Sequence, residues 1–198
     1  MRLRCISWTV LSLMFVVSSA SAQHNVIERA GPWQAFVTIG NQGGVICGIS
    51  QFANGLRFMI KWEPDRALLY LQLSNRVWSV PQGTSIPVSL DVDGQRIWSG
   101  ILYGTPMGHL IEGEFGSVES GTRTIVAFAY GIMMRVVFHE GTEGSWRVPL
   151  TGTLRVTTAF VRCMQTVTPQ RAPTQPFNPS PAPPPTQPFS PRGPSHRT

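Results

Sequence analysis

The sequence predicts an α+β fold: a mainly antiparallel, sandwich-like β-sheet, one or two helices in the second half, and one disulfide that closes the domain. Three observations lead to this prediction. Apolar residues alternate with polar ones along several short segments, which is typical of half-buried strands. Proline, aspartate and glycine separate those segments. Two segments of the second half carry apolar residues at helical spacing, and two cysteines lie near the two ends of the patterned region.

Two hairpins are predicted in the first half. Leu56–Trp62 and Ala67–Leu73 each alternate apolar and polar residues, and the Pro64-Asp65 pair between them favours a turn. Ser85–Val92 alternates in the same way and is joined to Gln95–Tyr103 by Asp93-Gly94, the pair that a two-residue hairpin prefers.

Two finer expectations concern the second hairpin. Ile97, Ile101 and Tyr103 have the spacing of one strand face. Pro87 has no N–H, so Ser85–Val92 is expected at a sheet edge.

The second half reads as mixed. We expect strands at Ile132–His139 and Trp146–Leu150. The segments 117–130 and 152–164 could be helix or strand by pattern, and we favour helix for both. Val118, Thr122, Ile125 and Ala129 would form the inner face of the first helix, Ser117 its N-cap and Gly131 its C′ residue; the β-branched residues of that segment argue against helix.

The chain begins like an exported protein. Residues 1–22 combine a basic start, an apolar run too short to be a permanent anchor, and a small-residue cleavage site between Ala22 and Gln23. We therefore expect a signal peptide, a periplasmic or secreted product, and no integral membrane segment in the mature chain. An N-terminal lead, residues 23–30, would precede a single globular domain at residues 31–165.

Export decides how the cysteines are interpreted. Cys5 leaves with the signal, so Cys47 and Cys163 have only each other as an intramolecular partner in an oxidising compartment. A disulfide between them would close a loop of 116 residues. In the chain-entropy model, closing a loop of that length stabilises the domain by about 4–5 kcal/mol. A free catalytic thiol and an intermolecular bridge are the alternatives.

The net charge of +6 does not indicate a nucleic-acid-binding face. Most of it belongs to arginines of the signal and the tail, so the folded part is nearly neutral and lacks the dense basic patch that phosphate contacts require.

Residues 166–198 are expected to be a disordered, Pro-rich tail. The tetrapeptide Thr-Gln-Pro-Phe occurs twice in this tail, ending at Phe177 and at Phe189. The tail is too poor in apolar residues to form a core. Pro-rich segments of this kind serve as spacers, which we favour, or as docking motifs that present one Phe each.

Several stretches resemble a group of small exported proteobacterial proteins that have one cysteine pair and no assigned chemistry. The resemblance rests on Gly31-Pro32-Trp33, Val45-Ile46-Cys47, Trp78–Gly83 and Gly144–Cys163, with Val156 where that group usually has alanine. A more distant similarity, in export, size and the early Trp and Cys, is to the invasion-associated locus B family. Either resemblance implies a compact exported domain with one disulfide and no known active site.

Few residues are candidates for catalysis or metal binding. Cys47 could be a nucleophile with His109 or His139 as base, but no catalytic signature surrounds it. His109, Glu112 and Glu114 could be metal ligands, although in a strand His109 would face away from both glutamates. Asp91–Gly94 begins like a calcium loop and lacks its closing ligands. We expect the tryptophans to serve mainly as core residues.

The sequence thus predicts a non-enzymatic exported domain without a cofactor, whose role is interaction with a protein partner in the cell envelope or facing a host. The alternatives are a periplasmic enzyme or enzyme inhibitor that uses Cys47, His139 or Glu112, and a structural envelope component.

Overall fold

The fold is an α+β structure built on one antiparallel sheet, as the sequence predicts. A computed structural model describes residues 24–40 and 43–168. Ten strands form a single sheet in the order β1-β2-β3-β4-β5-β8-β7-β6-β9-β10, and every neighbouring pair is antiparallel. The strands are β1 (Asn25–Ala30), β2 (Trp33–Ile39), β3 (Val45–Ala53), β4 (Leu56–Glu63), β5 (Leu68–Asn75), β6 (Ser85–Val92), β7 (Gln95–Gly104), β8 (Leu110–Glu114), β9 (Met133–Phe138) and β10 (Trp146–Pro149).

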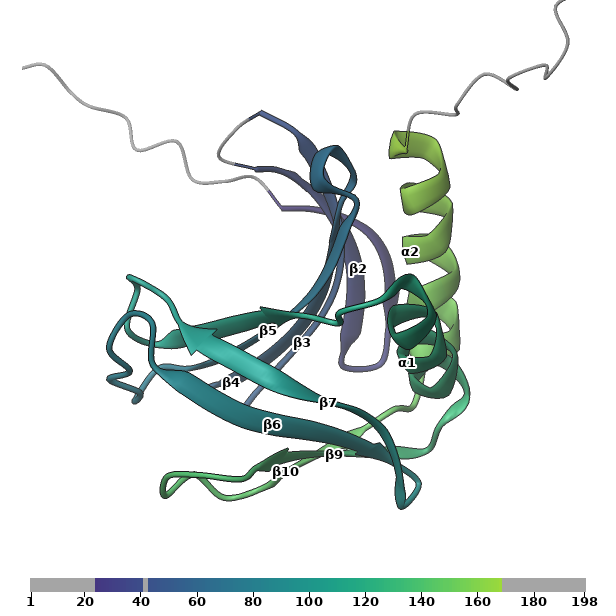
Figure 1. Ribbon diagram of the computed structural model, residues 1–198. Helices are drawn as coiled ribbons and strands as arrows, with labels where there is room; N and C mark the ends of the chain where they lie inside the picture. The colour runs from purple at the N-terminus through teal and green to yellow at the C-terminus, as the bar shows by residue number, and fades with distance from the viewer. Residues whose placement is uncertain (1–23, 41–42, 169–198) are drawn as a thin grey trace, which may run out of the picture.

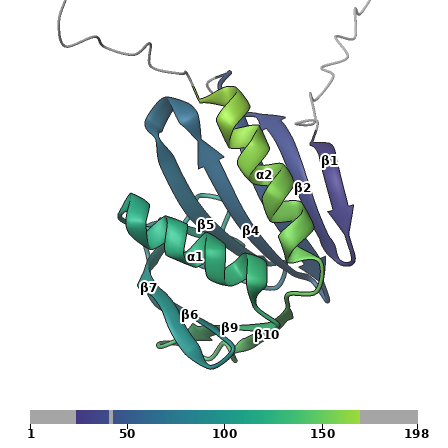
Figure 2. The ribbon, with the colours of Figure 1, turned by 90° about the vertical axis from the view of Figure 1, so that its right-hand side faces the viewer.

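Two helices cover the same face of this sheet. They are α1 (Val118–Tyr130) and α2 (Thr153–Val167), and a short 3-10 turn, η1 (Pro64–Arg66), joins β4 to β5. Figure 1 shows both helices on one side of the bent sheet, and Figure 2 shows them in front of its strands; α2 packs against β1, β2 and β3, whereas α1 contacts β7. The opposite face of the sheet carries no helix in the part of the chain that the structure describes.

The ends of the sheet approach each other because the sheet is strongly bent. The indole N–H of Trp33 at the start of β2 donates to the carbonyl of Pro149 at the end of β10, at 2.9 Å. The two segments are far apart in the sequence, and β10 leads directly into α2, which packs against β1, β2 and β3. The helix therefore covers the seam between the first and the last strands.

The N-terminal lead expected at residues 23–30 is part of the sheet. Residues 25–30 form β1, which pairs with β2 along its length and carries one irregularity between Val26 and Glu28. At the other end, α2 continues to Val167, two residues beyond the expected domain boundary. The signal segment at residues 1–22, with Ala22 and Gln23, and the tail residues 169–198, with Phe177 and Phe189, lie outside the described residues.

The expectation that Pro87 marks an edge strand is wrong. The strand β6 lies between β7 and β9. The ladder between β6 and β9 begins at Val88, and the Pro87 carbonyl accepts the backbone N–H of His139 at 3.0 Å just beyond it. Pro87 thus stands where the ladder ends, and its missing N–H interrupts no internal hydrogen bond of the ladder.

A β-bulge corrects the predicted face of β7. Leu90 and Asp91 are consecutive on β6, but their partners on β7 are Trp98 and Arg96, so Ile97 is an extra residue. Both Ile97 and Trp98 are buried as a result. The alternation changes phase after the bulge, which places Ile101 and Tyr103 on the helix-free face, about half exposed.

The segment 117–130 is helical, and its N-terminal cap agrees with the prediction. The Ser117 hydroxyl accepts the backbone N–H of Ser120 at 3.1 Å. The β-branched Thr124 is accommodated because its hydroxyl donates to the Ser120 carbonyl at 2.9 Å. The buried face contains Ile125 and Phe128, whereas Val118, expected inside, is exposed.

Gly131 ends α1 for a different reason from the one predicted. Its φ of −72° is open to any residue, so the left-handed C′ role does not apply. A Cβ at this position would meet Val92 at 2.3 Å and Leu150 at 2.8 Å. The glycine is needed because Val92 of β6 and Leu150, the residue after β10, approach the helix end closely.

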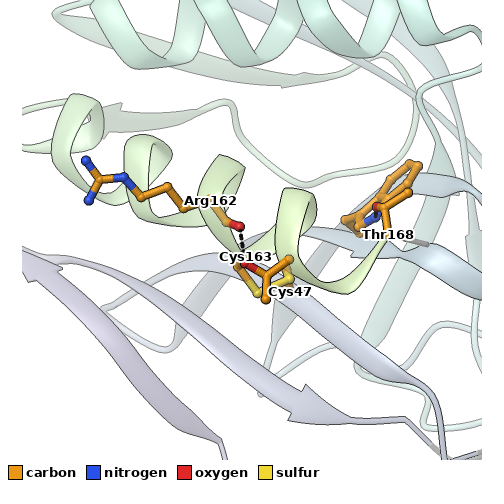
Figure 3. Close-up of a disulfide and its surroundings, with 6 residues drawn as sticks. Cys47, Arg162, Cys163 and Thr168 are labelled. Atoms are coloured by element: carbon orange, nitrogen blue, oxygen red, sulfur yellow. Dashed lines mark hydrogen bonds between the residues drawn. A yellow bond between two sulfur atoms is a disulfide. The ribbon is translucent and has the colours of Figure 1, made fainter. Parts of the chain in front are cut away.

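The predicted disulfide is present. Cys47 on β3 and Cys163 on α2 are bonded, with a Cα–Cα distance of 6.0 Å, and Figure 3 shows the bridge beneath the last turns of the helix. The residues of α2 next to the sheet, Val156 and Phe160, are fully buried. The final helix is thereby fixed to the sheet both covalently and by apolar packing.

The core lies between the helices and the sheet, and aromatic rings form its centre. Phe128 of α1 meets Trp33 of β2 edge to face, with ring centroids 4.8 Å apart, and stacks on Phe58 of β4 at 6.1 Å. Trp33, Trp98 and Trp146 are buried, while Trp62 and Trp78 pack against the core from partly buried positions. The tryptophans thus act as core residues, as expected.

Candidate functional site

The helix-free face of the sheet is hollowed into an open cleft, hereafter the groove. The groove has a volume of about 1040 Å³ and is formed mainly by outward-facing side chains of β4, β5 and β8, with contributions from β2, β3 and β7. Its size lies at the upper end of the range common for ligand-binding pockets, roughly 300–1000 Å³. The residues that line the groove include His24, Thr38, Arg57, Met59, Lys61, Tyr70, Gln72, Ile101, Tyr103, Met107, His109, Glu112 and Glu114.

The groove residues follow from the same alternation that builds the core. On β4, Phe58 and Ile60 point to the helices, so Arg57, Met59 and Lys61 point to the other side. Tyr70 and Gln72 of β5 alternate with the buried Leu71 and Leu73 in the same way. Two strand faces of opposite character are therefore specified by one sequence pattern.

The register arranges these side chains in two rows across the strands. Lys61 on β4 stands opposite Tyr70 on β5, which stands opposite Glu114 on β8.

The second row lies beside the first. It runs from Met59 through Gln72 and Glu112 to Tyr103. Within this row the Gln72 amide N–H donates to the Glu112 carboxylate at 2.6 Å.

A glycine shapes the first row beyond Lys61. Gly48 on β3 is the cross-strand neighbour of Lys61 on one side and of Phe36 on the other. A Cβ on Gly48 would lie 2.3 Å from the Phe36 ring, so the ring lies over the glycine. His24 in turn meets the Phe36 ring edge to face at 4.7 Å. This aromatic pair forms the wall next to Lys61.

The charges in the groove are separated by strand. Arg57 and Lys61 come from β4, whereas Glu112 and Glu114 come from β8. Within residues 24–40 and 43–168, none of these four takes part in an ion pair, although Glu63 and Arg66 at the rim pair with each other at 3.5 Å. The Arg57 guanidinium instead lies over the Phe52 ring, 5.7 Å from its centroid. The groove thus has a basic side and an acidic side with β5 between them.

Burial perturbs the titration of two groove residues. Burial lowers the pKa of Lys61; Glu112 opposes this shift and Arg57 adds to it. Burial, with the nearby carboxylates of Glu63 and Glu112, raises the pKa of Tyr70 to about 12. Tyr70 therefore stays neutral at any physiological pH and can act as a hydrogen-bond donor.

The basic side of the groove also affects His24. Burial lowers the pKa of His24, and the positive charges of Lys61 and Arg57 lower it further. The three groups are thus close enough to repel one another electrostatically, and an anion placed among them would relieve that repulsion.

Two buried polar atoms of the groove have no hydrogen-bond partner among the described residues: the side-chain carbonyl oxygen of Gln72 and the hydroxyl of Thr38. Both side chains are only 7% exposed. Such a group costs about 1–3 kcal/mol when buried alone, which makes unsatisfied groups uncommon in folded proteins. These two atoms therefore lie beneath the groove surface without a hydrogen-bond partner among the described residues.

The residues considered for catalysis are not brought together. Cys47 has no free thiol because it is bonded to Cys163. His139 lies beyond β9, where its Nε2 is 3.0 Å from the Ser89 hydroxyl, whereas Glu112 is on β8. β9 and β8 are separated by β6 and β7, so about 14 Å of sheet lies between these strands.

His109 differs from its expected orientation. The strand β8 begins at Leu110, so the alternation does not extend to His109, and this residue lines the groove together with Glu112 and Glu114. Its Nδ1 is 2.8 Å from the Met107 carbonyl. No group of three or more metal-ligating side chains occurs among the described residues.

Asp91–Gly94 has a structural role. Asp93 and Gly94 adopt positive φ values of 51° and 85°, as the predicted two-residue hairpin requires. The Asp93 carboxylate accepts the backbone N–H of Met133 at 2.9 Å, and Asp91 pairs with Arg96 and Arg135 at 3.0 Å each. Burial opposes ionisation of Asp91, but the two arginine hydrogen bonds outweigh it and keep its pKa below the usual value.

The tryptophan motifs form a second structural cluster. Trp78 and Trp146 stack with centroids 5.4 Å apart, and both indole N–H groups donate to the two carboxylate oxygens of Glu143 at 2.7 Å. Phe138 meets both rings edge to face. Two of the four stretches on which the family resemblance rests, those of Trp78 and Trp146, thus contact each other at the β10 side of the sheet, away from the groove.

The sequence reasoning did not identify Lys61 and Tyr70 as site residues. A signal was present: Lys61 is the chain's single lysine and stands in the middle of an alternating strand, on the polar face. The pairing of β5 with β8, which brings Glu112 and Glu114 next to Tyr70 and Gln72, is not visible in the sequence.

No protein-family model, curated protein or solved structure matches the chain. The resemblance to small exported proteins and to the invasion-associated locus B family therefore stays a prediction. Neither α1 nor α2, the two helices of the described residues, is long and apolar enough to span a membrane.

Proposed function

We propose that this chain is an exported, non-enzymatic interaction domain that binds a protein partner of the cell envelope through the groove. Signal peptide removal at Ala22–Gln23 would release the domain into an oxidising compartment, where Cys47 and Cys163 form their bridge. The Pro-rich tail would act as a spacer, or as a docking strip through Phe177 and Phe189.

One observation carries the proposal: the groove on the helix-free face is lined by unpaired charges of both signs. Arg57, Lys61, Glu112 and Glu114 surround a cleft of about 1040 Å³, and none of them has an ion-pair partner among the described residues. The other face of the same strands packs against the core. Separated unpaired charges beside partly exposed tyrosine and methionine side chains are suited to recognising a complementary surface.

One of the three candidate residues of the enzyme alternative, Cys47, has no free thiol. A thiolate mechanism needs a free thiol at Cys47, and the disulfide occupies it. The remaining two, His139 just after β9 and Glu112 on β8, are separated by β6 and β7. A binding role uses the residues that the fold brings together.

The experiment that tests the proposal is affinity capture from envelope extracts with the exported full-length chain. The groove variant Lys61→Met/Glu114→Gln is compared with a matched control, Arg162→Met/Glu119→Gln, which removes one charge of each sign from exposed positions on the two helices. We expect a partner that the wild type and the control retain at equal levels and that the groove variant loses. A partner retained equally by all three proteins contradicts binding through the groove.

A chain ending at Thr168, where α2 ends, tests the tail separately. Identical partners with and without the following residues would exclude docking through Phe177 and Phe189 and leave the spacer role.

A further inference from the structure

The unpaired charges lie at opposite ends of one cross-strand row. Lys61, Tyr70 and Glu114 are consecutive neighbours across β4, β5 and β8. Neighbouring strands are about 4.8 Å apart, so about 10 Å separates the backbone positions of Lys61 and Glu114. Lys61 is half-buried and Glu114 is exposed. A ligand that spans this row meets a cation at one end and a carboxylate at the other.

An extended peptide in the polyproline II conformation matches this separation. That conformation advances about 3.1 Å per residue with three residues per turn, so side chains three positions apart lie on the same face, about 9 Å apart. Tyr70 between the two charges offers an aromatic face and a neutral hydroxyl. That hydroxyl can donate to a backbone carbonyl of a bound peptide.

The rim provides apolar contacts for the same ligand. Ile101, Tyr103 and Met107 line the groove and are 46%, 48% and 64% exposed. They lie beside the acidic strand, where the aliphatic part of an arginine or lysine side chain would pack on them.

We infer that the groove binds an extended peptide segment carrying both charges, with an acidic group on Lys61 and a basic group three residues away on Glu114. This inference rests on the proposed binding function of the groove and names the chemistry of its partner. Arg57 increases the positive potential at the Lys61 end, and Glu112 increases the negative potential at the other. The orientation of the bound segment is therefore fixed by charge.

The protein's own tail is the competing occupant. Residues 169–198 contain arginines and no acidic side chain, so they offer a group to Glu114 but no acidic side chain to Lys61. The dipolar segment satisfies both ends, which is the reason for preferring it.

The test uses three synthetic peptides and the exported full-length chain at low ionic strength. The probe is acetyl-Gly-Asp-Ala-Ala-Arg-Gly-amide, and two further peptides replace its Asp by Asn or its Arg by Gln. Titrations followed by NMR report both affinity and location, through the side-chain amide of Gln72. We expect the dipolar peptide to bind about two- to five-fold more tightly than either neutralised peptide, as exposed ion pairs allow.

Variants assign each charge to its partner. Lys61→Met should abolish the difference between the Asp and Asn peptides and keep the difference between the Arg and Gln peptides. Glu114→Gln should do the reverse, and Arg162→Met/Glu119→Gln should leave both differences as in the wild type. This crossed pattern is not produced by a general loss of folding.

Two outcomes overturn the inference. Equal binding of the three peptides to the wild type, or variants that do not cross as described, would mean that the groove does not select a dipolar segment. A change in the Gln72 resonance on removal of the residues after Thr168 would mean that the tail occupies the groove. Both leave the capture experiment valid, so failure of this inference and failure of the proposed function are distinguishable.

Discussion

Phe58 and Ile60 of β4 are buried under the helices, while Arg57 and Lys61 of the same strand face the groove on the other side. The strand β5 repeats the division with Leu71 and Tyr70. One face excludes water and is filled by aromatic rings, and the other keeps unpaired charges beside unsatisfied polar atoms. The comparison indicates that the helix-covered face maintains the fold and that the helix-free face is available for binding.

The division also concerns how each face tolerates change. A buried ring that loses its neighbours is left beside a cavity, because the core is close-packed. A charge at an open cleft can instead be solvated by water. Substitutions on the two faces should therefore differ in their effect on stability, and the following predictions are ordered by that effect.

The largest effect is expected at the centre of the core. Phe128→Ala removes a fully buried ring that contacts Trp33 and Phe58. It should lower the free energy of unfolding by about 3–5 kcal/mol because the cavity cannot collapse completely. Urea denaturation followed by tryptophan fluorescence measures this. Tyr130→Ala, at a 74% exposed position of the same helix, is the control and should change stability by less than about 0.5 kcal/mol.

The disulfide should contribute the next largest effect. The Cys47→Ala/Cys163→Ala variant should lose about 2–4 kcal/mol, since the bridge closes a loop of 116 residues. Thermal and urea denaturation of this variant, beside the wild type under reducing conditions, give the value. Equal stability of the variant and the oxidised wild type would show that packing of Val156 and Phe160 alone holds α2 on the sheet.

A smaller loss is expected where the groove depends on a close approach. In Gly48→Ala the new methyl group meets the Phe36 ring, which must move away from its position over β3. We expect about 1–3 kcal/mol of destabilisation, as for other overpacked sites. Gly144→Ala is the matched control, because no atom lies within 4 Å of its added Cβ and its φ is ordinary. Comparable losses in both variants would mean that the Phe36 contact is not what limits substitution at Gly48.

The smallest effect on stability is expected for Lys61→Met. At neutral pH this substitution should raise the free energy of unfolding or leave it unchanged. The folded state lowers the pKa of Lys61 through burial, so protonation of this lysine disfavours folding. That penalty is fully present below the folded-state pKa and disappears as the pH rises to the ordinary lysine value near 10.4.

The pH dependence supplies the measurement. Lys61→Met should be at least as stable as the wild type at pH 7, and its advantage should shrink between pH 7 and about 10. Urea denaturation of both proteins at each pH, with Arg162→Met as the exposed control, measures this difference. A wild type that becomes less stable relative to Lys61→Met as the pH rises would contradict the assignment.

Prediction from sequence worked best where the pattern was local. The strands β4, β5, β6 and β9, the helix that begins after Ser117 and the turn at Asp93-Gly94 follow from alternation, capping and backbone preference. It was wrong at Pro87 and on β7, where the cause was non-local. An inserted residue at Ile97 changed which side chains faced the core, and a neighbouring strand covered the supposed edge.

The amino-acid sequence by itself determined the fold class, the cysteine pairing and the two characters of each strand, because these depend on residue type and on short-range periodicity. Only the tertiary structure decided that β5 pairs with β8, that the bulge at Ile97 sends Tyr103 to the helix-free face, and that both helices lie on the other one. These choices depend on contacts between residues distant in the chain. The groove exists because such contacts placed Lys61 and Glu114 at opposite ends of one row.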